Sequence, residues 1–248
     1  MTCVPWSGMV DDGLQARLRF RLRPATTSRR GLDGGRDEPL GLGDARDGLL
    51  YVPDTAEPGA PVLVFLHGAT GSGRAHLRAV LAAADRYGVV LLAPDSRHPV
   101  TWDLIAERRF GPDVAFLDRM LDTAVDGLDL DVDTARLAIG GVSDGASYAL
   151  AIGLSNGDVF STVLAFSPGF LVVREAAGRP RVFVSHGTAD PVLPIDACSR
   201  SFVPVLRDAG YDVRFHEFDG GHTVPPAVSD AGFRWWLTGN GGAGVSER

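Results

Sequence analysis

The sequence predicts an α/β fold built on a mostly parallel β-sheet with helices on both faces. From residue 61 onward, short apolar segments alternate with segments whose apolar residues recur at helical spacing. The apolar segments are continuous, so both faces of each strand must be covered, as in a parallel sheet flanked by helices. Two strand-like segments precede this alternation without a helix between them, which adds an antiparallel edge at the N-terminal side of the sheet.

The first expected strand covers residues 14–23, where apolar residues alternate with one glutamine and four arginines. We expect an edge strand, because charged residues on its open face discourage pairing with other sheets. Residues 24–47 are rich in Gly, Arg and Asp without periodicity, so they are predicted to form a long flexible loop. A second strand is expected at residues 48–53, where a proline ends it.

Strands and helices then alternate along the rest of the chain. No break in composition interrupts residues 50–238, so one domain spanning residues 1–248 is expected, with a frayed polar tail at 239–248. The expected strands cover residues 61–66, 89–93, 137–139, 163–166, 181–185 and 213–218, and the expected helices cover residues 77–84, 114–125, 146–154, 195–209 and 225–237.

Composition and charge narrow the class of protein. The 248 residues include 24 basic and 31 acidic side chains, for a net charge of -7, which repels nucleic acid and anionic lipid. No apolar run approaches the roughly 18 residues of a membrane-spanning helix, and the first twenty residues lack a secretory signal. We therefore expect no nucleic-acid partner and no membrane insertion. Two cysteines, Cys3 and Cys198, are too few for a disulfide framework and predict a reducing, cytoplasmic location, with Cys198 as buried packing.

A G-x-S-x-G motif covers residues 141–145, where a predicted strand meets a predicted helix. A serine at a sharp strand-to-helix turn has a strained backbone that exposes its hydroxyl, and glycine neighbours let the turn close. Ser143 is therefore a candidate nucleophile. A plain glycine-rich turn is the alternative interpretation of this segment taken alone.

A serine nucleophile needs a base, and the base needs a carboxylate that orients it. Asp190 follows the expected strand 181–185, and His222 follows the expected strand 213–218. In an open α/β sheet, such loops share one edge with the turn that carries Ser143, so the three side chains can converge.

Six histidines compete for the role of the base, and their positions separate them. His67 closes the strand 61–66 and precedes a glycine-rich loop whose backbone amides are suited to receive an oxyanion. Nothing places His76, on a helix, or His98, in a loop, beside Ser143. His186, at a strand end, and His216, inside a strand, are expected to be structural. His222 is therefore the preferred base.

The motifs together resemble the α/β-hydrolase superfamily. They cover residues 66–68, 141–145, 186–194 and 221–222, in the expected order within residues 46–237. Within the superfamily, the chain is similar to the bacterial phospholipase/carboxylesterase group, close to the dienelactone hydrolases and the esterase-like relatives of polyhydroxybutyrate depolymerases. The motifs specify the superfamily much more closely than the substrate.

The resemblance implies a role for each matching residue. Ser143 is expected to be the nucleophile, His222 the general base and then acid, and Asp190 the residue that orients the imidazole. The backbone N–H groups of Ala69 and Asp144 are expected to form the oxyanion hole. We expect no metal and no organic cofactor.

The connection at residues 167–180 is short where lipases with a lid usually carry an insertion, so we expect an open cleft without a large cap domain. Residues 95–112 are the best candidate for a wall of that cleft. Trp102, within them, is either a core residue or a substrate contact, and Phe170 and Leu193 are further candidates for substrate binding.

The sequence thus predicts a serine esterase that acts through an acyl-enzyme. The expected substrates are small-molecule carboxylic esters that are short-chain or bulky and soluble, and polyester oligomers are candidate members of this class. A thioesterase or lysophospholipase of the same fold is an alternative. A non-catalytic ligand-binding protein is a rival from another class, although it has no need of all three catalytic groups. A peptidase of this fold usually carries an extra domain, for which 248 residues leave no space. The sequence makes no prediction of the oligomeric state.

Overall fold

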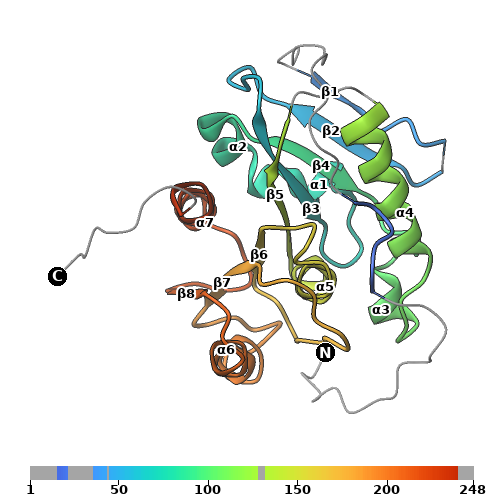
Figure 1. The fold of residues 1–248 in the computed structure, drawn as a ribbon. Coiled ribbons are helices and arrows are strands. Elements are labelled where there is room, and N and C mark those ends of the chain that lie inside the picture. Colours follow the sequence, from blue (N-terminus) through green and yellow to red (C-terminus); the bar gives the residue numbers. More distant parts are fainter. Residues whose placement is uncertain (1–15, 22–35, 44, 128–131, 240–248) are drawn as a thin grey trace.

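The computed structural model describes residues 16–21, 36–43, 45–127 and 132–239. Within them, eight strands form one sheet in the order β1-β2-β4-β3-β5-β6-β7-β8 (Figure 1). Neighbouring strands from β4 through β3 to β8 in this order pair in parallel, whereas β2 pairs antiparallel with both β1 and β4. The strands are β1 (Arg36–Pro39), β2 (Gly48–Val52), β3 (Ala60–Leu66), β4 (Val90–Pro94), β5 (Val132–Val142), β6 (Thr162–Phe166), β7 (Arg181–Gly187) and β8 (Val213–Phe218).

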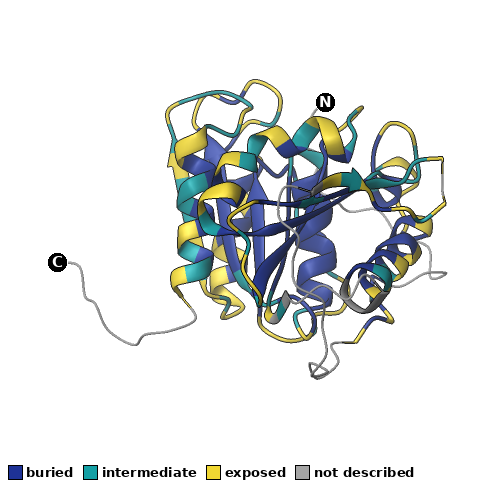
Figure 2. Cartoon of the chain, turned by 90° about the horizontal axis from the view of Figure 1, so that it is seen from above, coloured by how far each residue is buried: buried dark blue, intermediate teal, exposed yellow. Residues whose placement is uncertain are grey.

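Helices cover both faces of this sheet, and the predicted fold class is confirmed (Figure 1). Their outer faces are exposed while the sheet between them is buried (Figure 2). The helices are α1 (Gly73–His76), η1 (Leu77–Ala79), α2 (Leu81–Tyr87), α3 (Asp103–Ala106), α4 (Pro112–Leu121), η2 (Asp122–Gly127), α5 (Asp144–Ser155), α6 (Ser199–Asp208) and α7 (Pro226–Thr238).

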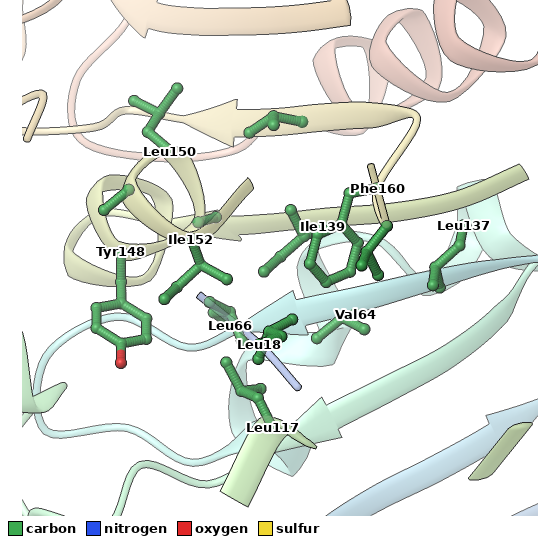
Figure 3. Packing of buried hydrophobic residues seen from close by; sticks show 14 of the residues in the cluster. Leu18, Val64, Leu66, Leu117, Leu137, Ile139, Tyr148, Leu150, Ile152 and Phe160 are labelled. Carbon is green, nitrogen blue, oxygen red and sulfur yellow. The ribbon is translucent and has the colours of Figure 1, made fainter. Parts of the chain in front are cut away.

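Alternate residues of each central strand belong to two separate hydrophobic clusters, one on each face. In β3, Val62, Val64 and Leu66 pack in the cluster that includes α4, α5 and α6. Leu63 and Phe65 pack in the other cluster, with α2 and α7. Figure 3 shows Val64 and Leu66 beside buried side chains from α4 and α5. Because every side chain of β3 is buried, the strand reads as a continuous apolar run.

The predicted strand at residues 14–23 is wrong in its described part, residues 16–21, which pair with no other strand. The alternation does predict burial, since Leu18 and Phe20 are buried between exposed or half-buried arginines. Side-chain acceptors replace the missing strand partner. The Leu18 N–H donates to Asn156 Oδ1 at 2.8 Å, and the Phe20 N–H donates to Asp118 Oδ1 at 2.9 Å.

The edge of the sheet is formed instead by β1, which lies inside the segment 24–47 that was predicted to be a loop. The described part of that segment is therefore partly a strand. Among the described residues, no helix is long and apolar enough to cross a membrane.

Cys198 precedes α6, is fully buried and takes part in a disulfide. Cys3 lies outside the described residues. The disulfide differs from the unpaired, buried cysteine that the sequence predicted at this position. The cytoplasmic location stays a prediction.

Candidate active site

The turn between β5 and α5 holds Ser143 in a strained conformation, with φ 57° and ψ -121°. Two glycines permit the close contacts that this turn requires. A Cβ on Gly145 would lie 2.2 Å from the carbonyl oxygen of Leu66, and a Cβ on Gly141 would lie 2.6 Å from the carbonyl of Gly145. Strain of this kind costs about 1 to 3 kcal/mol and is maintained by the surrounding packing. The turn leaves Ser143 half-buried at the end of the sheet.

Three side chains from three strand ends form a hydrogen-bonded row. His222, after β8, lies with its Nε2 2.9 Å from Ser143 Oγ. Its Nδ1 lies 2.6 Å from Oδ2 of Asp190, which follows β7. With the proton on Nδ1 donated to the carboxylate, Nε2 is left to accept the serine hydroxyl proton. The structure therefore brings together the three residues that the sequence singled out.

The carboxylate of Asp190 is buried but surrounded by donors. Its Oδ1 accepts the backbone N–H groups of Val192 and Leu193, both at 2.9 Å. Burial raises the pKa of Asp190, but the Leu193 N–H, His222 and the Val192 N–H outweigh it and leave the pKa below its usual value. Asp190 is therefore ionised near neutral pH and suited to hold a positively charged His222.

His186 supports the same loop and stays neutral. Its Nε2 donates to the carbonyl of Leu193 at 2.8 Å, and its Nδ1 accepts from the Ser199 hydroxyl at 2.7 Å. Burial lowers the pKa of His186. Nε2 thus holds the backbone of the loop that carries Asp190, and Nδ1 is held by a side chain of α6, so His186 is structural.

The loop after β3 lies beside Ser143, where an oxyanion would form. A Cβ on Gly68 would lie 3.4 Å from Ser143 Cβ. Within the described part of the chain, the backbone N–H groups of Ala69 and Asp144 donate to no other group. Two unpaired amides flanking a serine are the arrangement that an oxyanion hole requires.

Hydrogen bonds from the segment after β4 hold the loop between β3 and α1, residues 67–72, which we call the oxyanion loop. His67 Nδ1 donates to the carbonyl of Gly68 at 2.7 Å, and His67 Nε2 accepts the N–H of Ser96 at 3.0 Å. Burial lowers the pKa of His67 to about 4, so the ring is neutral and acts as a structural bridge. The Thr70 N–H donates to the carbonyl of Val100 at 2.6 Å.

Trp102 is a core residue, the first of its two predicted alternatives, and its proposed substrate contact is not seen. Its side chain is 1% exposed, its ring stacks on Tyr148 with centroids 5.1 Å apart, and its indole N–H donates to the carbonyl of His67 at 2.9 Å. Phe170 packs against the same hydrophobic cluster, and Leu193 lies against Gly169. The cavity beside Ser143 is lined by none of these three predicted contacts.

The cavity beside Ser143 has a volume of about 410 Å³ and is lined mostly by small apolar residues. The sequence predicted Ala69, Ser143 and His222 but missed the rest of the lining, because those residues come from loops, from the short helices α1 and η1 and from the end of β5. The one signal for His76 and its neighbours was position, since α1 follows the loop after β3 directly. The lining consists of Gly68, Ala69, Ala75, His76, Ala79, Val142, Ser143, Val192, His222 and Val224.

A buried pair of carboxylates organises the segment 95–113 behind the site. The N–H of Asp103 donates to Asp113 Oδ2 at 2.7 Å, and the N–H of Asp113 donates to Asp103 Oδ2 at 3.0 Å. The Tyr148 hydroxyl donates to Asp103 Oδ1 at 2.9 Å. Burial, followed by the charge of Asp113, raises the pKa of Asp103 to about 6.

One family model matches part of the chain. A family model described as Phospholipase/Carboxylesterase matches residues 108–228, a range that includes Ser143, Asp190 and His222. No curated protein matches the sequence.

Solved esterase structures have the same fold. Esterase PE8 is 25% identical, with a TM-score of 0.63 over 77% of this chain and 97% of its own. The Bacillus cereus carboxylesterase is 18% identical, with a TM-score of 0.63 over 80% of this chain and 97% of its own. FphF, a fluorophosphonate-binding serine hydrolase of Staphylococcus aureus, is 14% identical, with a TM-score of 0.65 over 83% and 99%. The chain therefore has the α/β-hydrolase fold of these esterases, and about half of it is similar to the phospholipase/carboxylesterase family.

Proposed function

We propose that this protein is a serine carboxylesterase that hydrolyses short-chain or bulky soluble esters through an acyl-enzyme on Ser143. The observation that carries the proposal is the hydrogen-bonded row of Asp190, His222 and Ser143, which opens into a cavity beside two unpaired backbone amides. The family match and the esterase neighbours support the same chemistry.

Acylation begins with attack of Ser143 Oγ on the ester carbonyl carbon, while the hydroxyl proton moves to His222 Nε2. The carbonyl oxygen becomes an oxyanion that accepts hydrogen bonds from the N–H groups of Ala69 and Asp144. Asp190 stays ionised and stabilises the imidazolium. When the tetrahedral intermediate collapses, the ester C–O bond breaks and His222 gives its proton to the leaving alcohol.

Deacylation repeats these steps with water as the nucleophile. His222 takes a proton from the water as it attacks the acyl carbon, and the same two amides hold the second oxyanion. The bond to Ser143 Oγ then breaks, and His222 returns the proton to that oxygen. The acid product leaves and the free serine is restored, so each cycle consumes one water and needs no other co-reactant.

The cavity favours small acyl groups over long ones. Its volume of about 410 Å³ lies at the lower end of typical ligand pockets, and its lining is short-chained. Thioesters and lysophospholipids follow the same acyl transfer and remain alternative substrates of the proposed site.

Hydrolysis of p-nitrophenyl esters from acetate to palmitate, by wild type and Ser143→Ala in parallel, tests the proposal. We expect a short-chain optimum in the wild type and a loss of roughly 10⁴-fold or more in kcat for the variant. A long-chain optimum would instead indicate a lipase or phospholipase. An inactive wild type that also fails to react with a fluorophosphonate would favour a non-catalytic binding protein.

A further inference from the structure

We propose that His76 determines substrate specificity by donating a hydrogen bond to a neutral oxygen on one arm of the ester. The inference rests on the proposed esterase function and names its substrate class. The preferred substrates are carboxylic esters that carry an ether or carbonyl oxygen a few atoms from the scissile bond, ahead of plain alkyl esters of equal length.

His76 ends α1 and lies against the oxyanion loop. A Cβ on Gly71 would fall 2.2 Å from the His76 ring, and a Cβ on Gly68 would fall 3.4 Å from its Nε2. These two glycines therefore leave the space that the imidazole occupies. The same ring lines the cavity that contains Ser143 and His222.

The imidazole of His76 lacks partners among the described residues. Its Nδ1 is buried without a hydrogen bond, and no described group bonds its Nε2. His67 provides the contrast, with ring centroids 6.1 Å away and both nitrogens paired, to the Gly68 carbonyl and the Ser96 N–H. An unpaired polar group beside a substrate cavity costs free energy that a substrate group can recover by pairing with it.

The chemistry of the ring indicates what the partner group is. A buried N–H without an acceptor is rarer than an under-satisfied acceptor, so we assign the ring N–H donor to Nε2 rather than to the buried Nδ1. The group bound by an N–H donor is an acceptor oxygen. The net charge of -7 disfavours an anionic substituent, so the oxygen is neutral.

The remaining lining supplies no competing polar side chain. Apart from Ser143 and His222, which take part in the reaction, His76 is the one polar side chain among the described residues that line the cavity. A site that hydrogen-bonds a substrate group discriminates against the analogue that lacks it, because its own group is then left unpaired. His76 therefore supplies the selectivity that the apolar lining cannot.

Two isosteric ester pairs test the proposal, one for each arm. Ether oxygen replaces methylene in p-nitrophenyl 3-methoxypropanoate against pentanoate, and in 2-methoxyethyl acetate against butyl acetate. We expect His76→Phe to reduce the ether-over-alkyl ratio of kcat/KM by roughly five- to tenfold in one of the pairs. His76→Gln, whose amide nitrogen reaches the position of Nε2, should restore most of the ratio.

His216→Phe is the matched control, because His216, in β8, stacks on Phe183 of β7 and does not line the cavity. This control should leave both ratios unchanged, and thermal unfolding checks that each variant is folded. If His76→Phe leaves the ether-over-alkyl ratio of kcat/KM unchanged in both ester pairs, the role of His76 is overturned and the esterase proposal stays intact. A wild type that hydrolyses none of the four esters would overturn the proposed function and this inference with it.

Discussion

Asp190 and Asp103 are both buried near the catalytic end of the sheet, at 6% and 1% exposure, yet their pKa values shift in opposite directions. Asp190 faces His222 and two backbone N–H groups, and its pKa is lowered. At Asp103, burial and then the charge of Asp113 outweigh the donors and raise the pKa to about 6. Burial raises the pKa of both carboxylates, so the sign of each shift depends on whether the donors outweigh burial together with neighbouring negative charge.

This difference separates catalysis from architecture. The ionised Asp190 pairs with a histidine that must become positively charged during the proposed reaction. Asp103 joins two turns of the segment behind the oxyanion loop, and nothing there requires its charge. The same substitution at the two positions should therefore affect different properties of the protein.

Asp190→Asn should have the largest effect on catalysis. An amide cannot stabilise the imidazolium and favours the wrong tautomer of His222, so we expect kcat to fall by about 10³- to 10⁴-fold. Steady-state hydrolysis of a short p-nitrophenyl ester measures this loss. Asp103→Asn is the matched control and should retain most of the activity. Equal losses in both variants would show that the site needs both carboxylates ionised.

Asp103→Asn should instead change the pH dependence of stability. The folded-state pKa of Asp103 is raised to about 6, so the folded protein binds a proton between pH 6 and 4 that the unfolded chain does not. Its contribution to stability is present at low pH and is lost as the pH rises through 6.

The free energy of unfolding of wild type, relative to Asp103→Asn, should thus increase by about 1 kcal/mol between pH 7 and pH 5. Urea unfolding at the two pH values measures the difference, with Asp190 unchanged in both proteins. If the difference in the free energy of unfolding between wild type and Asp103→Asn stays constant or becomes smaller on acidification, the raised pKa of Asp103 is contradicted.

Tyr148→Phe should have a smaller effect on the same network. The ring remains to stack on Trp102, but the hydroxyl that donates to Asp103 at 2.9 Å is lost. We expect a loss of about 1 to 2 kcal/mol at pH 7, where the carboxylate is ionised, and less at pH 5. In the double variant with Asp103→Asn the two losses should not add. Full additivity in urea unfolding would show that the hydroxyl acts independently of Asp103.

The sequence predicts the proposed catalytic residues better than the cavity around them. Ser143, Asp190 and His222 follow strand ends. Parallel strands bring their carboxyl ends to one edge of the sheet, and this does not depend on the conformation of the loops. The cavity lining depends on how loops pack. His76 belongs to a four-residue helix, and its approach to the site depends on the space above Gly71, which no periodicity reveals.

One failed prediction and one open alternative have the same physical origin. The alternation in residues 16–21 correctly marks which side chains are buried, but pairing depends on whether a strand or a side-chain acceptor such as Asn156 Oδ1 lies opposite. Trp102 was ambiguous for a similar reason, since a loop tryptophan contacts whichever partner its N–H reaches. Here that partner is the carbonyl of His67, inside the core.

The most direct test of the account is the intact mass of the protein after reaction with a fluorophosphonate, with peptide mapping of the adduct. We expect one adduct per chain on Ser143 in the wild type, none in Ser143→Ala, and much slower labelling in Asp190→Asn. Labelling that persists in Ser143→Ala, or an adduct mapped to another residue, would contradict Ser143 as the nucleophile.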